Sequence, residues 1–431
     1  MKLLRFLLVL AGLLGMVPAA RAYSVLTHQA VVDTAWTSVL RPLLERRYPG
    51  STDEELDEAR SYAYGGAIIQ DMGYYPMGSE LITNMMHYAR PGDFVRSLLQ
   101  QAHSRNEFAF ALGALAHYAA DAVGHAEGTN HVLPDVYGDL KQQFGPVVTY
   151  EQAPIRHTEL EFAFDVLQVA AGRYHTQDYH RAIGFRVSKP VLERAVRETY
   201  GVEIGQLMLN VDVSVATFRF TVNQLMPVAA RAAWHSQRKA IRRVDPHARR
   251  RDYMARHSRR DFEKEYGTDY QRPGLGARVL AKVINLLPKI GPLRKFTFTL
   301  PDKAGEQEFR RSFAASVAEY RRLIKQLPTD TTAQAGPLAN LNLDTGKPVA
   351  PAAYALADQT YNEWLHKLRK ADFEQLTLPV RQHLLRYYQA AATAGPAPAA
   401  KEVKPPDAKD REELQEDLQA LRALPAISAP K

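Results

Sequence analysis

The 431-residue chain contains no cysteine. Disulfides and thiolate zinc sites are therefore excluded, and so is catalysis by a cysteine nucleophile. Stability must come from packing, hydrogen bonds or metal bound through nitrogen and oxygen ligands. With 46% hydrophobic and 24% charged residues, the chain has ordinary globular composition and can bury a core.

Long hydrophobic runs are absent after residue 22, because charges and prolines interrupt the later apolar stretches. The first 22 residues have the pattern of a signal peptide. Lys2 and Arg5 precede the apolar run 6–17, which is shorter than the roughly 20 residues that a retained membrane anchor needs. Ala20-Arg21-Ala22 then gives a small-x-small cleavage pattern. We expect a mature chain that begins at Tyr23 and is exported to the periplasm or beyond.

Strand signals are scarce, since no alternating segments flank an Asn-Gly or Asp-Gly turn. Apolar residues instead recur at three and four spacing from Thr27 to Arg47, and the sequence Tyr48-Pro49-Gly50 ends that stripe. The same spacing returns in 106–126 and 154–171. The pattern predicts an all-α fold without internal repeats.

Several histidines and carboxylates of the first half are spaced four residues apart, which places both members of a pair on one helix face. The pairs are His117 with Asp121, Asp121 with His125, and His157 with Glu161. His117 and Asp121 directly follow the apolar run 108–116, where an unpaired charge would cost several kcal/mol. A bound metal ion is the simplest compensation, with Asp71 and His87 as further nitrogen and oxygen ligands of the kind zinc accepts.

The order and most spacings of these residues resemble the zinc-dependent phospholipase C family. The matching motifs are Tyr23-Ser24-Val25-Leu26-Thr27-His28, Asp71, His87, His117-Tyr118-Ala119-Ala120-Asp121 and His157-Thr158-Glu159-Leu160-Glu161. The resemblance implies an all-helical domain with three zinc ions, one of them held by the amine and carbonyl of an N-terminal Trp. Tyr23 takes the place of that Trp here, and because those ligand atoms are backbone atoms, signal cleavage would create the ligand.

The resemblance also implies a ligand set for each ion. The first zinc would be held by Tyr23, His28 and Asp121; the second by Asp71, His87, His117 and the bridging Asp121; the third by His125, His157 and Glu161. In the family the histidine after the bridging Asp comes at a slightly longer interval, so His131 is an alternative to His125. Asp71 would also orient or deprotonate an attacking water.

Clustered zinc ions activate water for in-line attack on phosphorus, so the expected activity is phosphodiester hydrolysis. Glu161 favours phospholipase C-type cleavage of phospholipid head groups, because this position resembles one that is Glu in phospholipases C and Asp in the related single-strand nucleases. Two alternatives remain open: a single-strand nuclease of the same fold, and a catalytically silent, metal-stabilised binding protein.

A formal charge of +8 suits anionic partners, either a lipid surface or nucleic acid. Two stretches could make such contacts: the basic segment 238–260, and 275–300, whose mixed apolar and basic composition suits an interfacial element. Solvated helix surface and a buried helix explain the same residues.

We divide the chain into a signal peptide (1–22), a phospholipase C-like domain (23–189), a helical extension (190–392) and a flexible tail (393–431). The extension is interrupted by turn-rich segments at 272–301 and 329–351, and it either stands alone or packs on the first domain as one unit. The tail is rich in Pro, Ala and Lys around one charged helical patch, 407–424.

Overall fold

A computed structural model describes residues 25–74, 78–170, 186–208, 212–214, 239, 241–243, 299–328, 335–395, 400, 403 and 405–425. These residues form helices and no β-strand, so the predicted all-α class is confirmed. Tyr23 and the signal peptide lie outside the described residues, as does nearly all of the two segments expected to contact anionic partners. Among the described helices, none is long and apolar enough to cross a bilayer.

The first half of the chain consists of short helices around one long helix. They are α2 (Val25–Ala35), η1 (Trp36–Leu40), α3 (Arg41–Arg47), α4 (Asp53–Gly66), η2 (Ile69–Tyr74), α5 (Glu80–Tyr88), α6 (Pro91–Gln100), α7 (Arg105–Gly124), η3 (His125–Thr129), α8 (Asn130–Val136), α9 (Gly138–Phe144), η4 (Tyr150–Gln152) and α10 (Pro154–Ala170). The predicted stripe 27–47 is helical throughout, with one π-helical turn, η1, inserted. The second predicted stripe, 106–126, is α7 followed by the π-helical turn η3.

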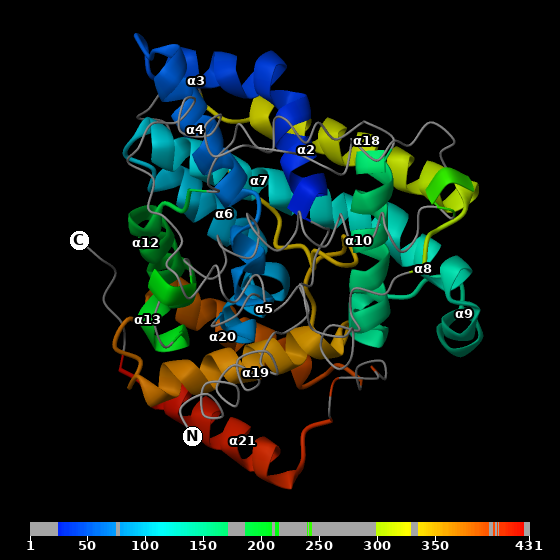
Figure 1. Ribbon diagram of the computed structural model, residues 1–431. Coiled ribbons are helices and arrows are strands. Elements are labelled where there is room, and N and C mark those ends of the chain that lie inside the picture. The colour runs from blue at the N-terminus through cyan, green and yellow to red at the C-terminus, as the bar shows by residue number, and fades with distance from the viewer. Residues whose placement is uncertain are drawn as a thin grey trace, which may run out of the picture.

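Helix α7 crosses the middle of the molecule, where α2, α4, α6 and α18 pack around it (Figure 1). Ser104 caps its first turn by accepting a hydrogen bond from the Glu107 amide, and nearly every side chain from Phe108 to Asp121 is buried. An apolar helix that is buried all round needs close neighbours on each side. This central position brings the polar groups near the C-terminal end of α7 into the core.

Helix α4 approaches α7 very closely because small residues line both helices at their contact. A Cβ on Gly66 would lie 1.9 Å from the carbonyl oxygen of Phe110, and a Cβ on Gly113 would lie 2.0 Å from that of Ala63. Only glycine fits at either position. The close contact also places the carbonyl of Ala67 beside α7.

The second half packs on the first rather than standing apart. Its described helices are α12 (Lys189–Tyr200), α13 (Ile204–Leu207), α18 (Lys303–Lys325), α19 (Ala355–Lys370), α20 (Leu378–Ala391) and α21 (Ala408–Ala423). Helix α18 lies along α7, and Tyr320 from α18 donates a hydrogen bond to the carbonyl of Leu112. Helix α19 packs on α5, and Trp364 donates to the carbonyl of Tyr200. Both halves therefore contribute to one hydrophobic core.

Helix α21 lies within the segment we expected to be a flexible tail. Leu418 and Leu421 are buried, and α21 packs against α19 in the lower layer of Figure 1. Asp417 pairs with His366 at 2.9 Å, and Arg381 donates to carbonyl groups at the end of α21. A few apolar residues on one face of this charged helix are enough to dock it.

Residues 335–354 form a segment without helices that precedes α19. We call this segment the strap. It is the gold coil near the centre of Figure 1 and contains the described part of the predicted turn-rich segment. Its Gly346 adopts a left-handed φ of 67° beside the carbonyl of Ala122. The strap thus runs against the end of α7.

Candidate metal centre

All eight predicted ligands that the structure describes lie in one buried cluster. They come from six parts of the chain: His28 on α2, Asp71 on η2, His87 on α5, His117 and Asp121 on α7, His125 on η3, and His157 and Glu161 on α10. The alternative ligand His131 is exposed, so the structure brings His125 and not His131 into the cluster. The ninth, Tyr23, lies outside the described residues.

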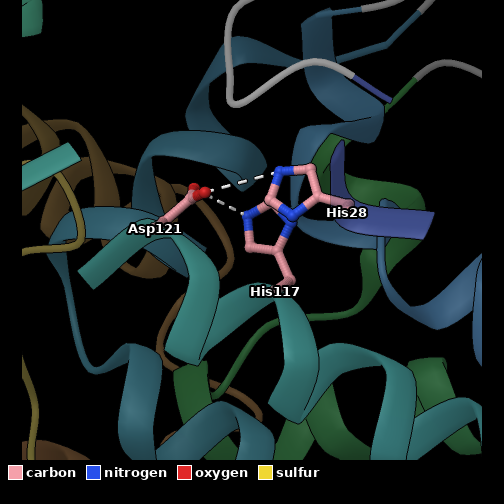
Figure 2. A group of neighbouring side chains, drawn as sticks. All are labelled: His28, His117 and Asp121. Carbon is pink, nitrogen blue, oxygen red and sulfur yellow. Dashed lines mark ion pairs between the residues drawn. The ribbon is translucent and has the colours of Figure 1, made fainter. Parts of the chain in front are cut away.

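Asp121 is the centre of the cluster. Its Oδ1 lies 3.4 Å from His28 Nε2 and 3.6 Å from His125 Nε2, while its Oδ2 lies 3.0 Å from His117 Nε2 and 3.3 Å from His87 Nε2. The rings of His28 and His117 stack with centroids 4.2 Å apart, and Figure 2 shows both pointing at the carboxylate. His28, His117 and Asp121 together form a group that could hold one metal ion.

A second group consists of Asp71, His87 and His117. His87 Nδ1 lies 2.8 Å from the carbonyl oxygen of Thr83, and His117 Nδ1 lies 2.9 Å from that of Ala67. A carbonyl oxygen only accepts, so both Nδ1 atoms carry hydrogen and both Nε2 atoms present lone pairs to the cluster.

Those lone pairs face other acceptors. His87 Nε2 is 3.1 Å from His117 Nε2 and 3.4 Å from Asp71 Oδ1. Neither oxygen of Asp121 nor Oδ1 of Asp71 has a hydrogen-bond donor. Acceptors buried against acceptors are unfavourable unless a proton or a cation lies between them.

The spacing of the acceptors fits zinc. Tetrahedral zinc with ligands at about 2.0–2.1 Å holds those ligands about 3.3 Å apart. Four separations between these groups, 3.0, 3.1, 3.3 and 3.4 Å, are close to this value, and the separation between His117 Nε2 and Asp71 Oδ1 is longer, at 4.0 Å. The donor set of imidazole and carboxylate, with backbone carbonyls behind the histidines, is also the one that zinc sites use.

The third group forms where α10 meets η3. Glu161 Oε1 lies 3.2 Å from His125 Nε2 and 3.1 Å from His157 Nδ1, and neither oxygen of Glu161 has a hydrogen-bond donor. On the far side of the two rings lies Asp344, which together with His125 and His157 forms a third group that could hold a metal. Asp344 is 2% exposed and belongs to the strap. Sequence reasoning missed this residue.

Hydrogen bonds hold two of the ligand-bearing segments in place. Asp165 on α10 accepts hydrogen bonds from the amide of Leu26 and the hydroxyl of Thr27, which holds the first turn of α2, and so His28, against the cluster. The hydroxyl of Thr83 accepts from the amide of Gly73, which ties η2, and so Asp71, to α5. Each of these ties holds a ligand-bearing segment against the helix next to it.

Burial and charge shift the pKa values of the cluster. Burial lowers the pKa of His28 well below its ordinary value, and repulsion from His117 adds to this. Burial also acts to lower the pKa of His87, but the neighbouring carboxylates of Asp121 and Asp71 outweigh it and raise that pKa to about 9. For Asp121, burial acts to raise the pKa, and the surrounding imidazoles outweigh it and hold the pKa well below the usual range. Without a metal ion, a proton on His87 would balance the negative charge of the carboxylates, and metal binding should release that proton.

Residues 27–209 match the family model described as zinc-dependent phospholipase C. This part of the chain is similar to the zinc-dependent phospholipase C family. No curated protein and no solved structure matches the chain. The phospholipase C segment contains every described ligand from His28 to Glu161 and ends well before Asp344. The family is described as zinc-dependent, and the three groups of side chains could each hold a metal ion.

Proposed function

We propose that the protein is a phospholipase C that hydrolyses the phosphodiester of a phospholipid head group. The family supports a zinc-dependent phosphodiesterase in general. The observation that carries the proposal is the set of buried acceptors around Asp121, which are arranged in three groups able to hold metal ions. The position of Glu161 resembles one that is Glu in phospholipases C and Asp in the related nucleases. The Glu in this chain therefore supports a lipid substrate.

Zinc ions bound at these groups would polarise a phosphoryl oxygen and lower the pKa of a bound water. The exposure of the ligand side chains indicates the side from which substrate can reach them. The side chains of His28, His117, Asp121 and His157 have no exposed surface, whereas those of Asp71, His87 and His125 are 4–5% exposed. The phosphate should therefore approach from the side where Asp71, His87 and His125 are exposed.

Asp71 is placed to act on the attacking water. Its Oδ1 accepts no hydrogen bond, and burial raises the pKa of its carboxyl group above the ordinary value. A carboxylate with a raised pKa is a better proton acceptor. In the proposed reaction Asp71 orients the water, takes its proton and thereby serves as the general base.

Tyr23 completes the first group in this proposal, after the export signal has been removed. Helix α2 begins at Val25, two residues beyond Tyr23, and its first turn is held beside the cluster by Asp165. The terminal amine and carbonyl of a chain that begins at Tyr23 would then reach the site near His28. Mass spectrometry of the purified mature protein tests this start directly.

The experiment that tests the function uses zinc-loaded protein and phosphatidylcholine in mixed micelles. Cleavage on the glycerol side of the phosphate should release phosphocholine, chelation should abolish the release, and added zinc should restore it. Asp121→Asn should be inactive, whereas His383→Gln, which alters a half-buried histidine on α20 outside the cluster, should keep activity.

Other outcomes would overturn the proposal. Release of free choline in place of phosphocholine would contradict C-type cleavage. Cleavage of single-stranded DNA without lipid hydrolysis would make the protein a nuclease. A full complement of zinc with neither activity would make it a metal-stabilised binding protein.

A further inference from the structure

The strap lies outside the family segment and is held firmly to the helices that carry the ligands. Asn340 exchanges two hydrogen bonds with Asp93, at 3.0 and 2.9 Å. The amide of Leu343 donates to the carbonyl of His87 at 3.1 Å. These contacts fix the residue that follows, Asp344, at the third group.

The carboxylate of Asp344 is already supplied with donors. Its Oδ2 accepts from the amide of Tyr150 and from the hydroxyl of Tyr354, both at 2.8 Å, and its Oδ1 accepts from Asn130 Nδ2 at 3.1 Å. Glu161, by contrast, accepts no hydrogen bond at either oxygen. Of the two carboxylates beside His125 and His157, only that of Glu161 lacks donors.

The contacts of Asp344 favour one placement of hydrogen on the ring nitrogens of His125 and His157. Its Oδ1 lies 3.4 Å from His125 Nδ1, so a hydrogen on that nitrogen would face the carboxylate. Because Asn130 turns its amide nitrogen toward the carbonyl and carboxylate of Asp344, its oxygen faces His157 Nε2 at 2.9 Å and accepts from it. His125 Nε2 and His157 Nδ1 are left with lone pairs, and both point to Glu161.

We propose that Asp344 is a positioning residue, supplied by the second half of the chain, that fixes the two histidines of the third zinc site. It acts directly on His125 and through Asn130 on His157, so that the metal is held on the Glu161 side of both rings. This inference rests on the proposed zinc site, although it does not depend on which phosphodiester is cleaved. It also gives the second half a role in the metal centre.

The test variant is Asp344→Asn, which keeps the shape but turns one acceptor oxygen into a donor. Outer-shell partners of this kind change metal affinity by about 10–100-fold. We expect one zinc ion per full-length chain to be lost to a competing chelator at a concentration about 10–100-fold lower than in wild type, and the other two to be retained. Metal content after dialysis against graded chelator measures this.

The matched control is Asn340→Ala, which removes a strap anchor and leaves Asp344 unchanged. It should shift the chelator midpoint by less than about threefold, below the range for outer-shell ligand partners. Equal weakening in both variants would show that only docking of the strap matters, and no weakening in Asp344→Asn would show that its carboxylate is irrelevant. Either result overturns the proposal.

The ring tautomers separate positioning from direct coordination. In zinc-loaded protein labelled with 15N-histidine, two-bond proton–nitrogen correlations should show hydrogen on Nδ1 of His125 and on Nε2 of His157. Metal on those two nitrogens instead would make Asp344 a ligand itself and overturn the inference. Neither readout uses a substrate, so failure to hydrolyse lipid would leave this result intact.

Discussion

Asp121 faces four histidines, and no hydrogen-bond donor serves either of its oxygens. Of the cluster carboxylates, it is the one that faces a histidine of each of the three groups. We expect Asp121→Asn to bind at most one zinc ion per chain and to lose most of the rise in melting temperature that zinc gives to wild type, because metal that binds the folded state stabilises it. Metal analysis and thermal unfolding with and without zinc measure both effects.

His383→Gln is the control for that variant, since His383 lies outside the cluster and bonds to the hydroxyl of Tyr361 at 2.8 Å. It should retain about three zinc ions and the full zinc-dependent shift. Unchanged zinc content in Asp121→Asn would remove Asp121 from the centre of the site.

At the scale of single residues, the sequence predicted the ligands that sit at helical spacing or in a family motif. His117, Asp121 and His125 were found because consecutive turns of one helix repeat every four residues. Asp344 was missed because it lies in a turn of the second half, where an Asp beside Asn342 and Gly346 is what ordinary turn chemistry predicts. Only the fold brings it to the histidines.

At the scale of elements, the contact between α4 and α7 positions His117 against the carbonyl of Ala67. We expect Gly66→Ala to destabilise the protein by about 3 kcal/mol, because overpacking costs this much when backbone must move and the added Cβ would lie 1.9 Å from a carbonyl oxygen. Chemical denaturation measures the change. Gly138→Ala, with nothing within 4 Å of the added atom, should change stability by less than about 1 kcal/mol. Similar small effects in both would contradict a tight helix contact.

Helices α19 and α20 should respond to pH through His383, whose pKa burial lowers from 6.5 to about 4. Below pH 6.5 the unfolded chain takes up a proton that the folded chain does not, so this contribution to stability is lost as the pH falls toward 4. At about 1.4 kcal/mol per pKa unit, wild type should lose about 2 kcal/mol relative to His383→Gln between pH 7 and 5. Urea unfolding of the zinc-loaded proteins measures the difference. Parallel losses in the two proteins would rule out His383 as the source.

Sequence patterns predicted the long helices well, and less regular elements poorly. Pro49 and Gly50 marked the end of the first helical stripe, and Pro154 marked the start of α10. The π-helical turns η1 and η3 insert a residue into an otherwise regular stripe, which apolar spacing cannot show. Turn η3 carries His125, so this irregular element determines the direction of a ligand side chain.

At the scale of the whole molecule, the family segment and the rest of the chain share a core. Val317 and Tyr320 from α18 are buried against α7, and the strap reaches the third group. We expect the fragment 23–209 to lack cooperative thermal unfolding, because α7 would expose one of its apolar faces to water. The chain 23–431 should unfold in one transition. A fragment that melts cooperatively at the full-length temperature would show that the first half is an independent domain.

The central claim is that this chain builds a zinc cluster around Asp121. Anomalous diffraction at the zinc absorption edge, from crystals of the purified mature protein, tests it most directly. The account predicts three peaks: one beside His28, one beside Asp71 and His87, and one between Glu161 and the rings of His125 and His157. An absence of peaks at these positions, with the side chains still gathered there, would contradict it.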